Sequence, residues 1–287
     1  MNWLITGGCG FLGTALIKRL LKEKSSHNIR VIDNLSVGSR DDLVQVCDFD
    51  EKSPEILDDD FKGVELVVGD ILDESIALLA TKGIDVIVHF AANTGVGPSV
   101  EEPRFDCLTN VIGTFNYLDA ARLNNVPRFV FASSGAPAGE VEPPIHEELP
   151  PHPVSPYGAS KLAGEGYCSA YYKTFGVDTV ALRFGNVYGP GSIHKSSVVA
   201  KFIKKAFNRE TLEIFGDGSQ TRDFIYIDDL ISAVILASTK KDVGGEVFQI
   251  ASNNETTVGE ITEKLIETLK RYGVTNIVVK NSEKRLG

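Results

Sequence analysis

The chain has 287 residues, 43% of them hydrophobic and 24% charged, a composition that provides for a large core and excludes a disordered chain. Its formal net charge of -10 argues against a general nucleic-acid or anionic-membrane surface, so an anionic ligand must be met by a few local Arg, Lys and backbone N–H groups. No stretch approaches the roughly 18 uninterrupted apolar residues of a membrane-spanning helix.

The first half of the chain alternates short apolar runs with helical patterns. The runs are too short and too continuously apolar to be surface helices, as is typical of strands buried on both faces of a parallel sheet. They lie at 2–6, 29–33, 64–70, 84–92 and 128–134, with helices expected at about 11–24, 73–80 and 104–123. This alternation predicts a doubly wound α/β sheet.

The second half opens with a Pro-rich loop, residues 135–156, whose prolines suit neither a helix nor a central strand. A loop of this length inside a compact domain is typical of a functional segment. Helices are then expected at about 157–175, 196–208, 227–238 and 257–271, strands at 177–184, 212–215, 246–251 and 275–279, and turns at 186–192 and 216–220. No linker separates these elements, which predicts two interleaved lobes.

A glycine-rich loop, TGGCGFLG at 6–13, follows the first strand and gives Gly7, Gly10 and Gly13 the spacing G-x-x-G-x-x-G. Such glycines allow a tight turn and let backbone N–H groups approach a pyrophosphate at the positive end of the next helix. Asp33 ends the second strand, where a carboxylate accepts hydrogen bonds from the adenosine ribose, and no Arg immediately follows it. The pattern favours NAD over NADP; the alternative is a glycine-rich turn without a ligand.

Two more strand ends lie at the carboxyl edge of the expected sheet, where open α/β sheets bind their ligands. One carries Asp70 and Ile71, and the other carries Phe90, Ala91 and Ala92. We expect all five near the cofactor. Asp70 also suits the N-cap of the helix that follows, and the two roles are compatible.

The stretch SPYGASK places Tyr157 and Lys161 four residues apart, so both side chains lie on one helix face and can address one ligand. Ser134, 23 residues earlier, ends a strand at the same sheet edge. Each feature alone has a simple structural alternative, a turn cap for the serine and an ordinary helix start for the pair. Together with the dinucleotide loop they predict an acid–base site.

The four cysteines, Cys9, Cys47, Cys107 and Cys168, are widely scattered, with no CxxC pair and no Cys/His cluster of zinc spacing. They predict reduced thiols and no metal site. The N-terminus, MNWLITGG, enters a strand without a basic and apolar leader, so a cytoplasmic protein is expected.

The motifs in this order resemble the extended short-chain dehydrogenase/reductase family, in its NAD-dependent nucleotide-sugar epimerase/dehydratase branch, and are most similar to UDP-hexose 4-epimerases. The matching pieces cover nearly the whole chain: TGGCGFLG, VIDNLS, GDI, HFAA, NVIGTFNYLDAAR, FASS, SPYGASKLAGE, LRFGNVYGPG and IFGDGSQTRDFIYIDDL. The resemblance implies a Rossmann-type domain at 1–184, with 228–251 returning to it, and a smaller C-terminal α/β substrate lobe at 185–227 and 252–287.

The resemblance also implies the roles of the site residues. Tyr157, its phenol pKa lowered from about 10 by Lys161 and the nicotinamide charge, takes a sugar hydroxyl proton as NAD takes the hydride. Lys161 binds the nicotinamide ribose, and Ser134 hydrogen-bonds the reacting oxygen. The 4-keto sugar then receives the same hydride on its other face. Further cofactor contacts are expected from Phe11, Leu12, Asn34 and Asn110.

In the substrate lobe the resemblance implies that Arg222 and Arg285 bind phosphate, that Asn186 contacts the substrate and that Phe215 lies against the nucleobase. Two alternatives stay open: an ion pair of Arg222 with Asp223 or Asp217, and core packing of Phe215. The resemblance also implies a homodimer through helices 104–123 and 157–175.

The sequence departs from the family after Ser134, where GAPAG replaces a step that commonly reads V-Y-G. Gly135 and Ala136 carry no acid at the position where dehydratases and decarboxylases of the branch place Asp or Glu, which favours epimerisation or ketoreduction. The alternatives are a CDP-sugar 2-epimerase or a nucleotide-sugar 4-ketoreductase on the same scaffold and, in another class, a non-catalytic NAD-binding scaffold. The family's residue that selects N-acetyl sugars is expected beyond Gly287, so the resemblance names no single hexose.

Overall fold

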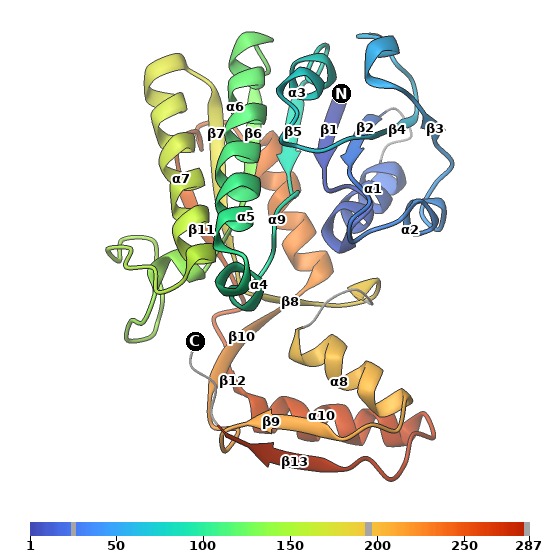
Figure 1. Cartoon of the computed structure of the whole chain (residues 1–287), viewed down its shortest axis with the longest axis vertical. Helices are drawn as coiled ribbons and strands as arrows, with labels where there is room; N and C mark the ends of the chain where they lie inside the picture. The colour runs from blue at the N-terminus through green and yellow to red at the C-terminus, as the bar shows by residue number, and fades with distance from the viewer. Residues whose placement is uncertain (24–26, 193–196, 284–287) are drawn as a thin grey trace. The chain divides into compact units, whose positions relative to one another are not determined.

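The computed structural model describes residues 1–23, 27–192 and 197–283. The chain divides into two compact units (Figure 1). Unit 1 comprises Met1–Phe184 and Ile231–Ile250, and unit 2 comprises Gly185–Leu230 and Ala251–Gly287.

Unit 1 is built on an eight-stranded sheet in which every pairing is parallel. In spatial order the strands are β11 (Val247–Ile250), β7 (Asp178–Phe184), β6 (Arg128–Ser134), β5 (Val86–His89), β1 (Asn2–Thr6), β2 (Asn28–Asp33), β4 (Val64–Val68) and β3 (Asp50–Glu51). The strand order reverses between β1 and β5, where Thr6 is in register with His89. This switch point is where doubly wound sheets bind their ligands, and the predicted fold class is confirmed.

The helices of unit 1 follow the strands in the alternation that the sequence predicts. They are α1 (Phe11–Glu23), α2 (Arg40–Val44), α3 (Glu74–Ala80), α4 (Val96–Glu101), α5 (Pro103–Cys107), α6 (Gly113–Leu123), α7 (Pro156–Phe175) and most of α9 (Ile227–Thr239), with short turns of 3-10 helix at Pro54–Ile56 and Ala136–Ala138. Figure 1 shows α3, α6 and α7 side by side in front of the sheet and α9 behind it. Both faces are therefore covered, as a parallel sheet requires.

The core between the sheet and α3, α6 and α7 takes alternate residues from successive strands, among them Leu4, Ile32, Ile87, Phe129 and Phe131. Each buried aromatic or aliphatic side chain of this kind contributes about 1.5–3 kcal/mol. These contacts fix α7, which carries Tyr157 and Lys161, against β6.

Helix α7 begins and ends where its sequence provides caps. The Ser155 hydroxyl accepts a hydrogen bond from Gly158 N at 3.1 Å, and Pro156 occupies the first turn, where a missing N–H is harmless. At the other end Gly176 has φ 72°, a left-handed conformation that glycine adopts without strain. The helix start, and with it the position of Tyr157, is thus set locally.

In its described residues, unit 2 contains two small sheets, the helices α8 and α10, and the first residues of α9. One sheet has the order β12 (Glu255–Thr257), β10 (Thr221–Tyr226) and β8 (Asn186–Tyr188), and the other pairs β13 (Val279–Ser282) with β9 (Leu212–Phe215). Helices α8 (Val198–Phe207) and α10 (Val258–Arg271) share an apolar cluster that includes Phe202, Leu212 and Leu269. A capping box between Thr257 and Glu260 starts α10.

Three sequence predictions are wrong in detail. The helix expected over 104–123 is divided into α5, a π-helical turn at Leu108–Ile112 and α6. The strand expected at 275–279 begins at Val279, because the partner strand β9 sets the register by pairing Leu212 with Val279. The turn expected at 186–192 opens with strand β8, which pairs with β10.

Candidate active site

The loop between β1 and α1 passes very close to the end of β5. A Cβ atom on Gly7, which has φ 67°, would lie 2.8 Å from Ala91 N, and one on Gly13 would lie 2.4 Å from Gly8 Cα. Only glycine allows this approach at either position. The glycines leave space beside the loop, and the positive end of the 13-residue helix α1 follows it. This arrangement fits a diphosphate held by backbone N–H groups.

Asp33 holds this loop from the end of β2. Its Oδ2 accepts a hydrogen bond from Cys9 N at 2.9 Å, and its Oδ1 accepts one from Leu35 N at 2.8 Å. Burial raises the carboxyl pKa, and the two backbone hydrogen bonds act in the opposite direction. Each oxygen can accept a further hydrogen bond, so Asp33 fits the ribose hydroxyls of NAD.

The structure brings Asn34 and Asp70 together, with Asn34 Nδ2 3.1 Å from Asp70 Oδ2. Asp70 Oδ1 accepts from Leu72 N in a local turn, and the N-cap of α3 is Asp73. Asp70 as the cap of that helix is therefore wrong, because α3 begins one turn later. Ile71 is buried, and its carbonyl accepts from Asn116 Nδ2 at 3.0 Å.

The residues after β5 border the glycine loop directly. Ala91 N donates to Thr6 Oγ1 at 3.2 Å, and the Phe90 and Phe184 rings lie 6.5 Å apart between centroids. Phe90, Ala91 and Ala92 are partly buried, as are Phe11 and Leu12 at the start of α1. These residues thus surround the switch point of the sheet.

Ser134, Tyr157 and Lys161 meet at the carboxyl end of β6. A hydrogen bond from Ser134 lowers the pKa of Tyr157, but burial raises it more, to about 12. The net direction is opposite to the lowering expected from Lys161. Lys161 Nζ instead donates to Ala132 O at 3.0 Å and lies 5.9 Å from the centroid of the Tyr157 ring.

Lys161 is almost fully buried, at 3% exposure, with its Nζ 5.0 Å from the centroid of the Phe131 ring. Burial lowers its pKa to about 8, against the opposing charges of Asp106 and Glu165. Its ammonium group is therefore still mostly protonated at neutral pH, as proton transfer at Tyr157 requires.

A buried ion pair behind the site was missed by the sequence reasoning. Glu165 accepts from Arg183 Nε at 2.9 Å and Nη2 at 2.8 Å and also accepts from Ser133 Oγ. The three residues tie α7 to β6 and β7. The position of Glu165 four residues after Lys161 on the same helix face is the signal that could have found it.

Asn110 lies in the π-helical turn, an irregularity that is common at functional sites. It is buried, its Oδ1 accepts from Asn93 N at 2.8 Å, and its Nδ2 lies 3.0 Å from Asp106 Oδ1 and 3.1 Å from Ser160 Oγ. Asp106 is buried as well and was not predicted. The helical spacing of four residues between Asp106 and Asn110 was the available signal.

The predicted substrate residues of unit 2 lie on separate strands. Asn186 and Arg222 are exposed on β8 and β10, and Arg222 Nη1 donates to Thr221 O at 2.7 Å. Asp223 accepts from Ser252 N and Asn254 N, and within the described ranges no ion pair joins Arg222 to Asp223. Arg285 lies outside the described residues.

Phe215 ends β9 on the side opposite to the buried Leu212 and Ile214. Its ring is partly buried, and Lys201 Nζ lies 5.7 Å from the ring centroid. This placement argues against simple core packing for Phe215.

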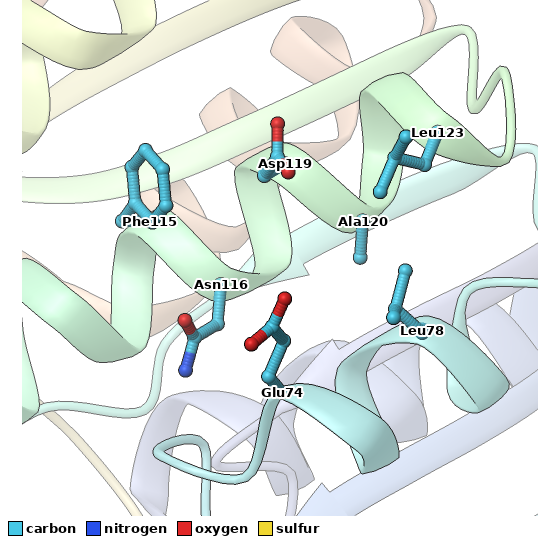
Figure 2. A pocket seen from close by; sticks show the side chains of 7 residues that line it. All are labelled: Glu74, Leu78, Phe115, Asn116, Asp119, Ala120 and Leu123. Carbon is cyan, nitrogen blue, oxygen red and sulfur yellow. The ribbon is translucent and has the colours of Figure 1, made fainter.

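Other candidate sites are weaker. Figure 2 shows a pocket between α3 and α6 of about 10 Å³, room for one water molecule at most. Its lining holds no predicted site residue: Glu74, Leu78, Phe115, Asn116, Asp119, Ala120 and Leu123. Among the residues that the structure describes, no cluster of three acidic, His or Cys side chains could hold a metal, and no helix is long and apolar enough to cross a membrane.

The family model for the NAD dependent epimerase/dehydratase family matches residues 3–251. The chain belongs to this family. It is 36% identical over 266 residues to the UDP-glucose 4-epimerase of Mycolicibacterium smegmatis, covering 91% of this chain and 80% of that one.

Two solved structures of the family show the same fold. The UDP-glucose 4-epimerase of Thermotoga maritima with UDP-glucose superposes with a TM-score of 0.85 at 31% identity, covering 100% of this chain and 87% of that one. The UDP-glucose 4-epimerase of Thermus thermophilus with NAD gives 0.84 at 31% identity, covering 100% and 88%. The chain is thus an enzyme of the NAD-dependent epimerase/dehydratase type, and the prediction of NAD is confirmed.

Proposed function

We propose that this chain is a nucleotide-sugar 4-epimerase, with a UDP-hexose as substrate and NAD tightly held. The observation that carries the proposal is the placement of Ser134 beside Tyr157, with Lys161 on the same face of α7 and no acid at Gly135 or Ala136. Elimination of water from a keto sugar needs such an acid, whereas epimerisation needs the proton shuttle and hydride transfer but no further acid.

In the proposed reaction Tyr157 accepts the proton of the sugar O4 hydroxyl, and Ser134 hydrogen-bonds the same oxygen as it becomes a carbonyl. NAD, when bound, accepts and returns the C4 hydride, and its positive nicotinamide ring favours the phenolate of Tyr157. Lys161 stays protonated beside them. When the 4-keto sugar has presented its other face, Tyr157 returns the proton to O4, so protons and electron pairs balance.

We propose that the nucleotide is held by unit 2. Arg222 offers a planar guanidinium that suits a diphosphate, and Phe215 offers a partly buried ring that suits a nucleobase. Asn186 is proposed to contact the sugar. Arg285 stays a prediction from the resemblance.

We also propose a homodimer through α5, the π-helical turn, α6 and α7. These helices expose large apolar side chains on unit 1, including Phe105 at 53% and Phe175 at 52%, together with Leu108, Ile112 and Tyr167. An exposed apolar set of this kind on two neighbouring helices is typical of an isologous interface. Equilibrium sedimentation should give a mass of two chains; a mass of one chain would refute this arrangement.

The cytoplasmic location proposed from the sequence is supported by four unpaired thiols, Cys9, Cys47, Cys107 and Cys168.

The test of the proposed function is a proton NMR time course with UDP-glucose, UDP-galactose and their N-acetyl and uronic forms, without added cofactor. We expect one pair to interconvert at C4 and Tyr157→Phe to abolish conversion while retaining NAD. Conversion only of a CDP-sugar would favour the CDP-sugar 2-epimerase. Consumption of added NADH would favour the nucleotide-sugar 4-ketoreductase. Unchanged turnover in Tyr157→Phe would remove Tyr157 as the base.

A further inference from the structure

Asp106, on α5, is a buried carboxylate without a cationic partner within the described part of the chain. Its exposure is 0%, and Oδ1 accepts only from neutral amides, Asn110 Nδ2 at 3.0 Å and Asn93 Nδ2 at 3.4 Å. Oδ2 has no hydrogen-bond partner among the residues that the structure describes. Burying an unpaired charge costs free energy, so a carboxylate kept at this position indicates either a nearby positive charge that stabilises it or a functional role.

Lys161 is a buried cation that likewise has no ion-pair partner among the described residues. It is a buried ammonium whose Nζ donates to a carbonyl, Ala132 O, and none of the described carboxylates lies within ion-pair distance of it. Asp106 and Glu165 are the two acids whose charges act on it. Arg183 cancels the charge of Glu165 with two hydrogen bonds, so Asp106 provides the negative charge that no cation cancels.

The side chains of Asn110 and Ser160 connect Asp106 to the helix turn that carries Tyr157. Asn110 Nδ2 joins Asp106 Oδ1 to Ser160 Oγ at 3.1 Å, and Ser160 Oγ donates to Tyr157 O at 3.0 Å. The π-helical turn places Asn110 in this chain of contacts. A movement of α5 relative to α7 would therefore break the buried Asn110–Ser160 hydrogen bond or the buried Asn110–Asp106 hydrogen bond.

We propose that Asp106 is the fixed counter-charge of the active site, which keeps Lys161 protonated and Tyr157 neutral until substrate and cofactor are in place. Asp106 is a positioning residue: it acts through Lys161 and Tyr157 and does not touch the substrate. Its effect on turnover rests on the proposed function, while its effect on the titration of Tyr157 does not.

Other ionisable groups near α7 do not supply this charge. His89 on β5 is buried, and burial followed by the charge of Lys161 lowers its pKa to about 3, so it is neutral. The charged residues of the packed elements are otherwise paired or exposed: Arg183 with Glu165, Asp119 with Arg122, Arg128 with Asp178, and Glu101 and Arg104 at the surface.

The test is Asp106→Asn, which removes the charge and keeps the shape. Without the negative charge the pKa values of both Lys161 and Tyr157 fall. The alkaline limb of the turnover profile, where Lys161 loses its proton, should therefore shift to lower pH. Asp106→Glu should restore the profile, and Glu101→Gln, which removes an exposed charge from α4, should leave it in place.

A titration without substrate separates this inference from the proposed function. The ultraviolet phenolate signal of Tyr157, obtained as the difference between each variant and its Tyr157→Phe counterpart, should appear at lower pH in Asp106→Asn. An unchanged titration, or turnover that falls equally at every pH, would overturn the role of Asp106. If circular dichroism shows that Asp106→Asn is unfolded, Asp106→Ser, which leaves room for water, takes its place. The Tyr157 titration and the pH profile of turnover are then measured on that variant, with the same expected and contradicting results.

Discussion

The hydroxyl of Ser134, at the last residue of β6, lies beside the phenol of Tyr157, in the first turn of α7. Ser134 lowers the pKa of Tyr157, so it stabilises the phenolate against the stronger effect of burial. A Pro-rich segment of 22 residues, 135–156, separates the two positions in the chain. The fold, and not sequence proximity, makes this contact.

Ser134→Ala should therefore raise the pKa of Tyr157 further, because the lowering effect of Ser134 is lost, and move the acidic limb of the turnover profile to higher pH. Loss of one donor to the reacting oxygen typically costs about 100-fold in turnover. The measurement is the rate as a function of pH. Ser133→Ala is the matched control, because that hydroxyl donates to Glu165; a limb that moves equally in both variants would contradict the assignment.

Asp33→Asn should weaken NAD binding about 10- to 100-fold, because it replaces a charged acceptor and turns an amide N–H group toward Cys9 N or Leu35 N. Calorimetric titration of NAD-stripped protein measures the change. Asp41→Asn, on an exposed face of α2, removes the same charge and should bind NAD normally. Equal affinities in all three proteins would refute the role of Asp33.

Gly164→Ala tests the close packing of α7 on the sheet. The new Cβ would lie 2.4 Å from Phe131 Cζ, and overpacking of this kind costs about 1–3 kcal/mol. Turnover should fall too, since Tyr157 and Lys161 are carried by the displaced helix. Gly166→Ala, where nothing lies within 4 Å, should stabilise the protein by about 0.5–1 kcal/mol. Urea unfolding measures the stability of the two variants. Equal midpoint concentrations of urea for Gly164→Ala and Gly166→Ala would show that Gly164 is not closely packed against Phe131.

Glu165→Gln leaves the Arg183 guanidinium buried without its carboxylate, which should lower the free energy of unfolding by about 3–5 kcal/mol. Glu23→Gln, in an exposed pair with Arg19, should cost less than about 1 kcal/mol. Thermal unfolding of the two variants gives the comparison. A small effect at Glu165 would mean that α7 is held by apolar packing alone.

Local sequence predicted the parts of the site that depend on local backbone. The glycine spacing of 6–13, the strand end at Asp33 and the Tyr157–Lys161 helix face follow from turn chemistry and helical periodicity, and the structure places them around the β1/β5 switch point. The βαβ alternation predicted a parallel sheet with right-handed crossovers, and the strand order itself comes from the structure.

Contacts between distant elements were not predictable in this way. Glu165 and Arg183 pair only because α7 packs on β7, and the π-helical turn at Leu108–Ile112 reads as ordinary helix in the sequence. Propensity likewise placed the last strand at 275–279, whereas pairing with β9 decides where it begins. The pattern of a single sequence does not specify which residues of two strands pair, nor which charged side chains meet when distant elements pack together.

In the proposed reaction one hydride leaves C4 of the sugar and returns to it within one active site. The direct measurement is conversion of a UDP-hexose deuterated at C4, with excess unlabelled NADH in solution, followed by mass spectrometry and NMR of the product. We expect a C4-epimerised product that retains its deuterium at C4. Epimerised product that has lost the deuterium, or a reduced sugar formed at the expense of the NADH, would contradict it.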